Sequence, residues 1–213
     1  MCMDLTKYTH ATVVLTKDDT TLVIDPGAYT PNSADLVART TAVLVTHDHL
    51  DHLDADVLTA ALDARPELRV WAPASVTEAL GDHDGRVTTV APGDTFDAAG
   101  FSVQVVGGDH AVIHADIPLM SNVGYVVDGA VYHPGDAYFV PEVAVETLLV
   151  PTSGPWAKLS ELVDFVRAVH PSRAVQIHDL MLSDAGKGSF AQFAQQLTGT
   201  ELVTLADGET ITL

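Results

Sequence analysis

A series of short apolar runs rich in valine, isoleucine and threonine limits the folds open to this chain. Such runs indicate β-strands. Between some of them, apolar residues at helical spacing predict helices over Asp54–Ala64, Ser75–Leu80, Lys158–Val169 and Ser189–Leu197. Strands therefore alternate with helices in the later part, and the sequence predicts a mixed α/β (α+β) protein. The runs lie at residues 11–16, 21–25, 41–47, 68–73, 86–90, 101–108, 122–127, 130–136, 147–153, 174–178 and 202–208.

Length and composition suggest where such a protein works. At 213 residues we expect one domain over 1–213. The apolar runs are too short for a membrane span of about 20 residues, and the opening "MCMDLTKYTH" lacks the basic and apolar segments of a signal peptide. Cys2, the single cysteine, allows no internal disulfide. We therefore expect a cytoplasmic protein that does not bind membranes.

The charge balance disfavours one class of partner. The net charge is -19, from 10 Lys and Arg against 29 Asp and Glu. Such a surface repels a phosphate backbone, so no nucleic-acid partner is expected. The composition does not decide the oligomeric state, and a homo-oligomer is possible.

One stretch carries an unusual density of ionisable side chains. "LVTHDHLDHLD", Leu44 to Asp54, places three histidines and three aspartates directly behind an apolar run and contains no lysine or arginine. A solvated charge run is the simpler interpretation. However, no neighbouring cationic residue can neutralise the carboxylates, whereas imidazole and carboxylate are both zinc ligands. The stretch therefore predicts a metal site, with His47, His49, Asp51 and His52 as candidates.

Four residues do not complete two metal sites, so further ligands are expected from other strand ends. Three candidates each follow an apolar run: His110 in "VVGGDHAV", Asp136 in "YHPGDA" and His178 in "VQIHDL". Unrelated polar residues at strand ends are the alternative. Their order along the chain favours one shared centre.

This ordered set, HxHxDH followed by a lone His, a Gly-Asp and a final His, resembles the metallo-β-lactamase superfamily, as does the earlier "LVIDPG". The resemblance implies a four-layer αβ/βα sandwich with two central mixed sheets flanked by helices and the metals at one edge. It also implies that His47, His49 and His110 hold one metal, that Asp51, His52 and His178 hold the other, and that Asp136 bridges both.

Two divalent ions that share a hydroxide can activate it for hydrolysis, so the expected protein is a hydrolase. Zinc is the most expected metal, with manganese or iron as alternatives. Asp51 and Asp136 are the expected catalytic residues. No serine lies in a nucleophile-elbow sequence, so water is the expected nucleophile.

Other residues are candidates for supporting roles. Asp25 is expected either to hydrogen-bond a ligand histidine or to form a turn before Pro26. His10 and His114 could border the mouth of the site, although a structural role is the stronger expectation for each. The candidate substrate contacts are Tyr29, Tyr138, Ser153, Trp156 and Lys158.

The substrate class rests on a looser likeness. "HATVVL", "GGDH" and "HPGDA" look most like the ascorbate-6-phosphate lactonase-like group, which implies a small molecule with a lactone, other ester or phosphodiester bond. Three alternatives stay open: a phosphodiesterase or nuclease similar to tRNA-processing members, a metal-binding protein without turnover, and a mono-iron redox enzyme.

Overall fold

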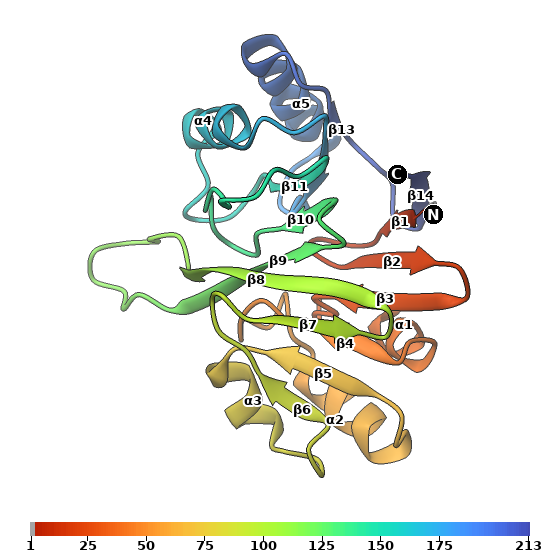
Figure 1. Cartoon of the computed structure of the whole chain (residues 1–213). Helices are drawn as coiled ribbons and strands as arrows, with labels where there is room; N and C mark the ends of the chain where they lie inside the picture. Colours follow the sequence, from red (N-terminus) through yellow and green to blue (C-terminus); the bar gives the residue numbers. More distant parts are fainter. Residues whose placement is uncertain (1–2) are drawn as a thin grey trace.

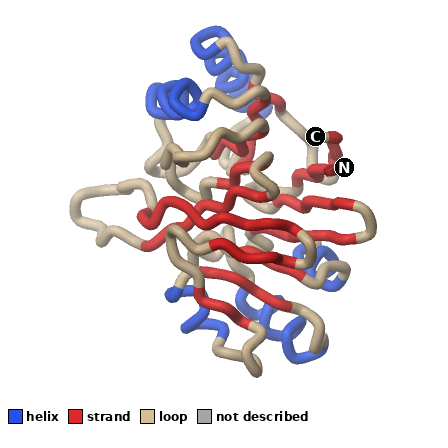
Figure 2. Tube along the Cα trace, viewed as in Figure 1, coloured by secondary structure: helices blue, strands red, loops and turns tan. Residues whose placement is uncertain are grey.

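The computed structural model describes residues 3–213, so Cys2 lies outside the described residues. Within them the chain forms two seven-stranded sheets and five helices. Figures 1 and 2 show the sheets face to face at the centre, with helices on both outer sides. The expected four-layer sandwich of two mixed sheets is confirmed.

The first sheet combines an antiparallel half with a parallel half. Its strands are β1 (Met3–Lys7), β2 (Val13–Lys17), β3 (Thr20–Ile24), β4 (Ala42–Leu44), β5 (Arg69–Ala72), β6 (Val87–Thr89) and β14 (Glu209–Thr212). Their order is β14-β1-β2-β3-β4-β5-β6. Pairing is antiparallel from β14 to β3 and parallel from β3 to β6.

The second sheet has the same mixed character. Its strands are β7 (Thr95–Ala98), β8 (Phe101–Asp109), β9 (Ser121–Val127), β10 (Val131–His133), β11 (Thr147–Pro151), β12 (Arg173–Ile177) and β13 (Leu202–Val203). Their order is β13-β12-β11-β10-β9-β8-β7. Pairing is antiparallel from β7 to β10 and parallel from β10 to β13.

Alternation along the strands divides the interior into three cores. In β4, Ala42 and Leu44 face the core between the sheets, whereas Val43 faces the core under the helices. Because successive side chains point to opposite faces, one strand supplies two cores. The helices are α1 (Ser33–Ala38), α2 (Ala55–Ala64) and α3 (Ala74–Leu80) over the first sheet, and α4 (Leu159–Val169) and α5 (Asp184–Thr198) over the second.

The helices agree with the sequence expectation except at α1 and α5. Asp54 caps α2 by accepting from the Val57 backbone N–H at 3.1 Å. Helix α5 is longer than expected: Ser183 accepts from the Gly186 N–H at 3.2 Å and starts the helix before the apolar spacing begins. Gly186 and Gly188 weaken the helical pattern there.

Strands β1, β7 and β14 and helix α1 were not expected from the sequence. Strands β7 and β14 lack an apolar run, because much of each is exposed. Helix α1 has only six residues, too few for a periodic pattern. No helix within residues 3–213 is long and apolar enough to cross a membrane.

Candidate metal centre

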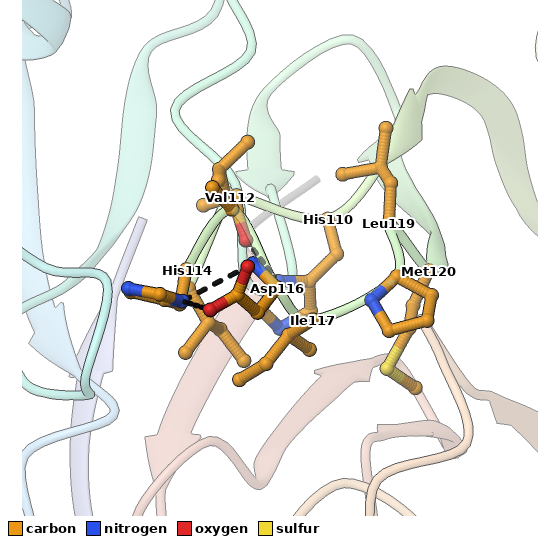
Figure 3. A pocket seen from close by; sticks show the side chains of 11 residues that line it. His110, Val112, His114, Asp116, Ile117, Leu119 and Met120 are labelled. Carbon is orange, nitrogen blue, oxygen red and sulfur yellow. Dashed lines mark hydrogen bonds and ion pairs between the residues drawn. The ribbon is translucent and has the colours of Figure 1, made fainter.

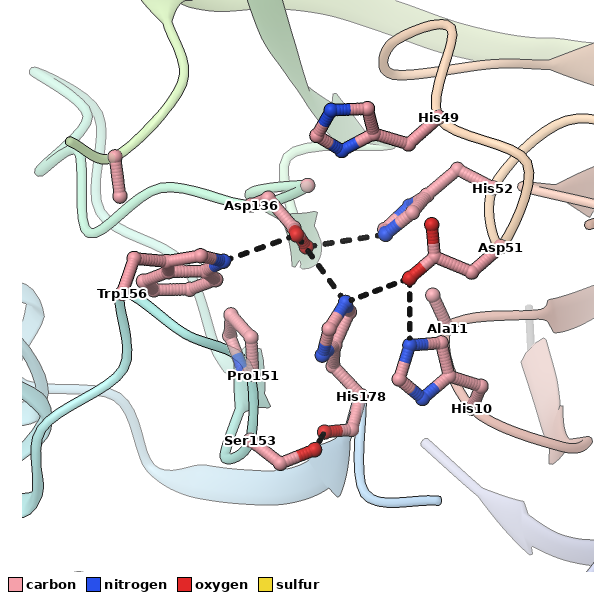
Figure 4. Close-up of polar contacts among 12 residues, drawn as sticks. His10, Ala11, His49, Asp51, His52, Asp136, Pro151, Ser153, Trp156 and His178 are labelled. Carbon is pink, nitrogen blue, oxygen red and sulfur yellow. Dashed lines mark hydrogen bonds and ion pairs between the residues drawn. The ribbon is translucent and has the colours of Figure 1, made fainter. Parts of the chain in front are cut away.

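The metal ligands expected from the sequence gather at strand ends near the edge of the two sheets. In Figure 4 the side chains of Asp51, Asp136 and His178 point toward one another although they follow different strands. Strand ends hold functional side chains firmly because the sheet fixes their backbone. The loop after β4 carries His47, His49, Asp51 and His52, whereas His110, Asp136 and His178 follow β8, β10 and β12.

The first group that could hold a metal ion consists of His47, His49, His110 and Asp136, whose donor atoms all lie within 4.8 Å of one another. His47 Nε2 is 3.0 Å from His49 Nδ1, and His110 Nε2 is 3.4 Å from Asp136 Oδ2. Two nitrogens bound tetrahedrally to one zinc at 2.0–2.1 Å lie about 3.3 Å apart. The spacing therefore suits a single ion.

The second group consists of His10, Asp51, His52 and His178, with donor atoms within the same 4.8 Å. Asp51 Oδ2 lies 3.0 Å from His10 Nε2 and 3.4 Å from His178 Nε2. Three of these residues are those that the resemblance assigns to the second metal. His10 also lies within this distance.

Asp136 contacts both groups. Its Oδ1 is 3.1 Å from His52 Nε2, and its Oδ2 is 3.2 Å from His178 Nε2. Since Oδ2 also lies 3.4 Å from His110 Nε2, one carboxylate reaches imidazoles of both groups. This is the position that a bridging ligand requires.

Several atoms of the two groups are buried without a hydrogen bond. Among residues 3–213, His52 Nε2, His110 Nε2, His178 Nε2 and Asp136 Oδ1 belong to this set. The contacts of these nitrogens with Asp136, at 3.1–3.4 Å, are ion pairs between imidazoles and a carboxylate. A buried polar atom without a hydrogen bond costs about 1–3 kcal/mol, so a further partner common to all four would stabilise the site. A cation suits nitrogen and carboxylate donors alike, and the donor set therefore fits metal ions.

The pKa shifts differ between the two groups. Burial lowers the pKa of His47 and His49, which favours neutral imidazoles, whereas the pKa values of His52 and His178 are raised. Burial opposes charge on His52, but the Asp136 and Asp25 carboxylates outweigh it and hold its pKa well above 6.5. Burial likewise opposes charge on His178, yet Asp136 raises its pKa to about 8. His52 and His178 in turn hold the pKa of Asp136 well below its usual range, against burial. Protons thus supply charge that a metal would replace, because a ligating imidazole is neutral.

Hydrogen bonds from Nδ1 of His47 and His110 to the protein direct Nε2 of each ring toward the other residues of the first group. His110 Nδ1 donates to the Ala111 carbonyl at 2.6 Å. The Thr46 hydroxyl donates its proton to Asp25, so it can only accept from His47 Nδ1, which lies 3.0 Å away. Metal-binding histidines ordinarily show such a bond from the other ring nitrogen.

Asp25 organises the loop from a fully buried position. Its carboxylate accepts from the Thr46 N–H at 2.7 Å, from Thr46 Oγ1 at 2.8 Å and from His52 Nδ1 at 2.7 Å. The sequence left two roles open, and both are present. Asp25 bonds a candidate ligand, and Gly27 N–H donates to the Asp25 carbonyl at 2.8 Å in a turn.

His10 is fully buried. The expectation that it borders the mouth of the site is therefore wrong. The Leu180 N–H donates to His10 Nδ1 at 3.4 Å. The proton of a neutral imidazole is then on Nε2, which donates to Asp51 Oδ2 at 3.0 Å. His10 in this tautomer orients Asp51 and offers no lone pair to a metal.

Three residues of the centre have a left-handed backbone, and one glycine beside it allows a close backbone contact. His10, Asp25 and His178 have φ values of 64°, 52° and 50°, in the left-handed region that costs non-glycine residues about 1–3 kcal/mol. Gly27 permits a close approach, because a Cβ there would lie 1.9 Å from the Asp51 carbonyl oxygen. Strain of this kind is typical of functional sites.

The remaining candidates divide into near and distant residues. Trp156 is buried and its Nε1 donates to Asp136 Oδ2 at 3.1 Å. Tyr138 packs against Trp156 with ring centroids 5.1 Å apart, but its hydroxyl donates to the Pro151 carbonyl. His114 belongs to neither group. Its side chain is 64% exposed and lies 3.5 Å from Asp116.

Three further expected substrate contacts have other partners. Ser153 Oγ donates to the His178 carbonyl, and Lys158 Nζ pairs with Glu161 at 2.8 Å. Ser153 is therefore engaged inside the protein, whereas Lys158 lies in an exposed pair at the start of α4. Tyr29 lies beside His10, with ring centroids 5.6 Å apart.

Two further residues support the centre and were not expected from the sequence. Asn122 Oδ1 accepts from the Asp136 N–H at 2.9 Å, which fixes the candidate bridging residue. Asparagine is uncommon in strands, so its place in the apolar run "NVGYVV" was a usable signal. Met120 Sδ lies 3.2 Å from His49 Nε2, a contact without a sequence signature.

The fold and the two His/Asp groups define an αβ/βα sandwich protein with residues that could bind metal at one edge of its sheets. The beta-lactamase superfamily domain matches residues 4–178. The chain belongs to this superfamily.

One relative and two solved structures are similar to nearly the whole of this chain. Protein Rv0786c of Mycobacterium tuberculosis is 34% identical over 215 residues, which cover 99% of this chain and 100% of that protein. Igni18, a metallo hydrolase of Ignicoccus hospitalis, has a TM-score of 0.77 at 18% identity over 100% of this chain and 99% of its own. CmlA, a diiron β-hydroxylase of Streptomyces venezuelae, has a TM-score of 0.71 at 18% identity over 99% of this chain and 54% of its own.

Proposed function

We propose that this protein is a hydrolase that binds two divalent ions, zinc first, and cleaves an ester or lactone bond of a small molecule. The observation that carries the proposal is the Asp136 carboxylate, which lies within 3.4 Å of imidazoles from both groups. Such ions would polarise the scissile bond and bring the pKa of a water toward about 7. In this proposal His47, His49 and His110 hold one ion, Asp51, His52 and His178 hold the other, and Asp136 contacts both.

The chain's own groups would set the geometry of the reaction. His10 donates to Asp51 Oδ2 at 3.0 Å. Asp51 Oδ1 is therefore the oxygen that is available to accept a proton or to bind a metal ion. Trp156 donates to Asp136 Oδ2 at 3.1 Å and thereby limits rotation of that carboxylate. Held in this way, both carboxylates are oriented before substrate arrives, which lowers the cost of reaching the transition state.

Two observations bear on the alternatives. The net charge of -19 disfavours a nuclease. CmlA has a similar fold and is a diiron hydroxylase, so a redox enzyme is the second candidate. Imidazole and carboxylate ligands do not by themselves select zinc, manganese or iron.

Metal-dependent turnover tests the proposal. The protein is stripped with a chelator, reloaded separately with zinc, manganese or iron, and assayed on γ-butyrolactone, p-nitrophenyl acetate and bis-p-nitrophenyl phosphate. We expect that the stripped protein is inactive and that zinc restores lactone or ester hydrolysis. His49→Ala should not recover, whereas His170→Asn, at the exposed end of α4, should.

Three other results of this assay would each favour one of the alternative functions. Turnover of the phosphodiester alone would favour the phosphodiesterase alternative. Iron-dependent oxygen consumption would favour the redox enzyme. Tight metal binding without turnover of any of the three substrates would leave a metal-binding protein.

A further inference from the structure

The loop between β8 and β9 forms a cavity next to the candidate metal centre. The cavity has a volume of about 450 Å³ and is lined by residues 110–120. Small-molecule sites typically have volumes of about 300–1,000 Å³. Its two ends reach the first group, because His110 is a member and Met120 Sδ lies 3.2 Å from His49 Nε2. Figure 3 shows Val112, Ile117 and Leu119 around this space.

The lining of this loop is unusually apolar for an exposed segment. Val112, Ile117 and Leu119 are 68%, 46% and 57% exposed. Exposed apolar residues scattered singly need no explanation, but a cluster marks a binding surface. Within residues 3–213 the large exposed apolar side chains outside the site loops are two on α5, Phe193 and Leu197. Those in loops that carry or adjoin site residues are Tyr29, Leu50, Val112, Ile117, Leu119, Phe139, Val140, Leu180 and Met181.

Positive charge is scarce around this surface. The loops over residues 8–12, 25–32, 45–54, 110–120, 134–146, 152–158 and 178–183 contain one lysine, Lys158, and no arginine. That lysine pairs with Glu161 at 2.8 Å. A phosphate or sulfonate group is ordinarily recognised by Arg or Lys. Among the described residues, no Arg or Lys lines the cavity, and Lys158 is not among the residues around it, so an anionic group bound in the cavity would meet no Arg or Lys side chain there.

We infer that the substrate is an uncharged ester or lactone whose alkyl chain packs on Val112, Ile117 and Leu119 while its carbonyl faces the centre. The inference rests on the proposed function, and it narrows the substrate from small molecules in general to apolar ones. It excludes the phosphodiesters that the sequence likeness also implied, because a phosphodiester carries an anionic phosphate.

Binding of a non-hydrolysed series tests the alkyl subsite without requiring turnover. γ-Lactams carrying no chain or an ethyl, butyl or hexyl chain are titrated calorimetrically into the metal-loaded protein. Each buried methylene contributes about 0.8 kcal/mol, so we expect Kd to fall up to about fourfold per methylene. In the double variant Val112→Ser, Leu119→Ser the hexyl lactam should bind at least about tenfold more weakly, and the unsubstituted lactam should bind as before.

A matched control separates the subsite from general surface effects. Phe193→Ser, which removes a 44%-exposed apolar side chain from α5, should leave the whole series unchanged. A Kd independent of chain length would overturn the inference, as would loss of self-association in the double variant on size-exclusion chromatography with light scattering. The latter would make the loop a contact between copies.

The same series separates this inference from the proposed function. Chain-dependent lactam binding without hydrolysis of any matching lactone would retain the alkyl subsite and reject the hydrolase. Hydrolysis of the matching lactones at a kcat/KM independent of chain length would retain the hydrolase and reject the subsite.

Discussion

Asp136→Asn is expected to lower turnover by more than about 100-fold and to reduce bound metal, while the fold persists. Loss of a hydrogen-bonding partner of a metal ligand typically costs 10–100-fold in affinity or activity, and Asp136 contacts both groups directly. Asparagine keeps the volume of the side chain, so no cavity opens in this buried place. The measurement combines kcat with metal content, and circular dichroism monitors the fold.

A charge-matched variant controls for the change in net charge. Asp164→Asn, on the exposed side of α4 with its side chain 78% exposed, should leave turnover and metal content unchanged. Wild-type turnover in Asp136→Asn would mean that the carboxylate does not join two metal sites.

Asp25→Ala should lower the free energy of unfolding by about 3–5 kcal/mol, the cost of removing one partner from a buried charged pair. Three donors lose their acceptor: the Thr46 N–H, Thr46 Oγ1 and His52 Nδ1. Each is buried, so water cannot replace the carboxylate freely. Urea denaturation of the metal-free protein measures the loss without a contribution from bound ions.

Asp128→Ala supplies the comparison. Asp128 also has a left-handed backbone, with φ 51° against 52° for Asp25, and its carboxylate also accepts a backbone N–H, that of Ser102. Its side chain is 23% exposed and lies outside the two groups. We expect a loss of about 1 kcal/mol there. Equal losses at the two positions would remove the special role given to Asp25.

Local patterns predicted the fold where they were strong. The run around Val43 and the periodic apolar face of α4 were readable because each buries a regular stripe. Strand β1 was missed although its burial alternates, because it is short and ends at a lysine. Lys7 is nevertheless buried, since its Nζ pairs with Asp179 at 2.9 Å. That partner lies 172 residues away, so no local pattern could supply it.

Most of the candidate centre could also be predicted from local sequence patterns. His47, His49, Asp51 and His52 are adjacent in the sequence, and the other expected residues follow apolar runs. The contribution of His10 was not readable, because it depends on a backbone N–H of Leu180 and a carboxylate of Asp51. The direction of these hydrogen bonds decides which ring nitrogen of His10 faces the centre. It depends on residues far apart in the chain, so the spacing of residues in the sequence does not predict it.

If the two His/Asp groups bind one metal ion each, elemental analysis of protein purified without chelator should find about two divalent ions per chain in the wild type. We expect about one in His47→Ala and about two in the control His114→Ala, whose side chain belongs to neither group. Wild-type protein without metal, or His47→Ala with as much metal as the wild type, would mean that these groups do not bind one ion each.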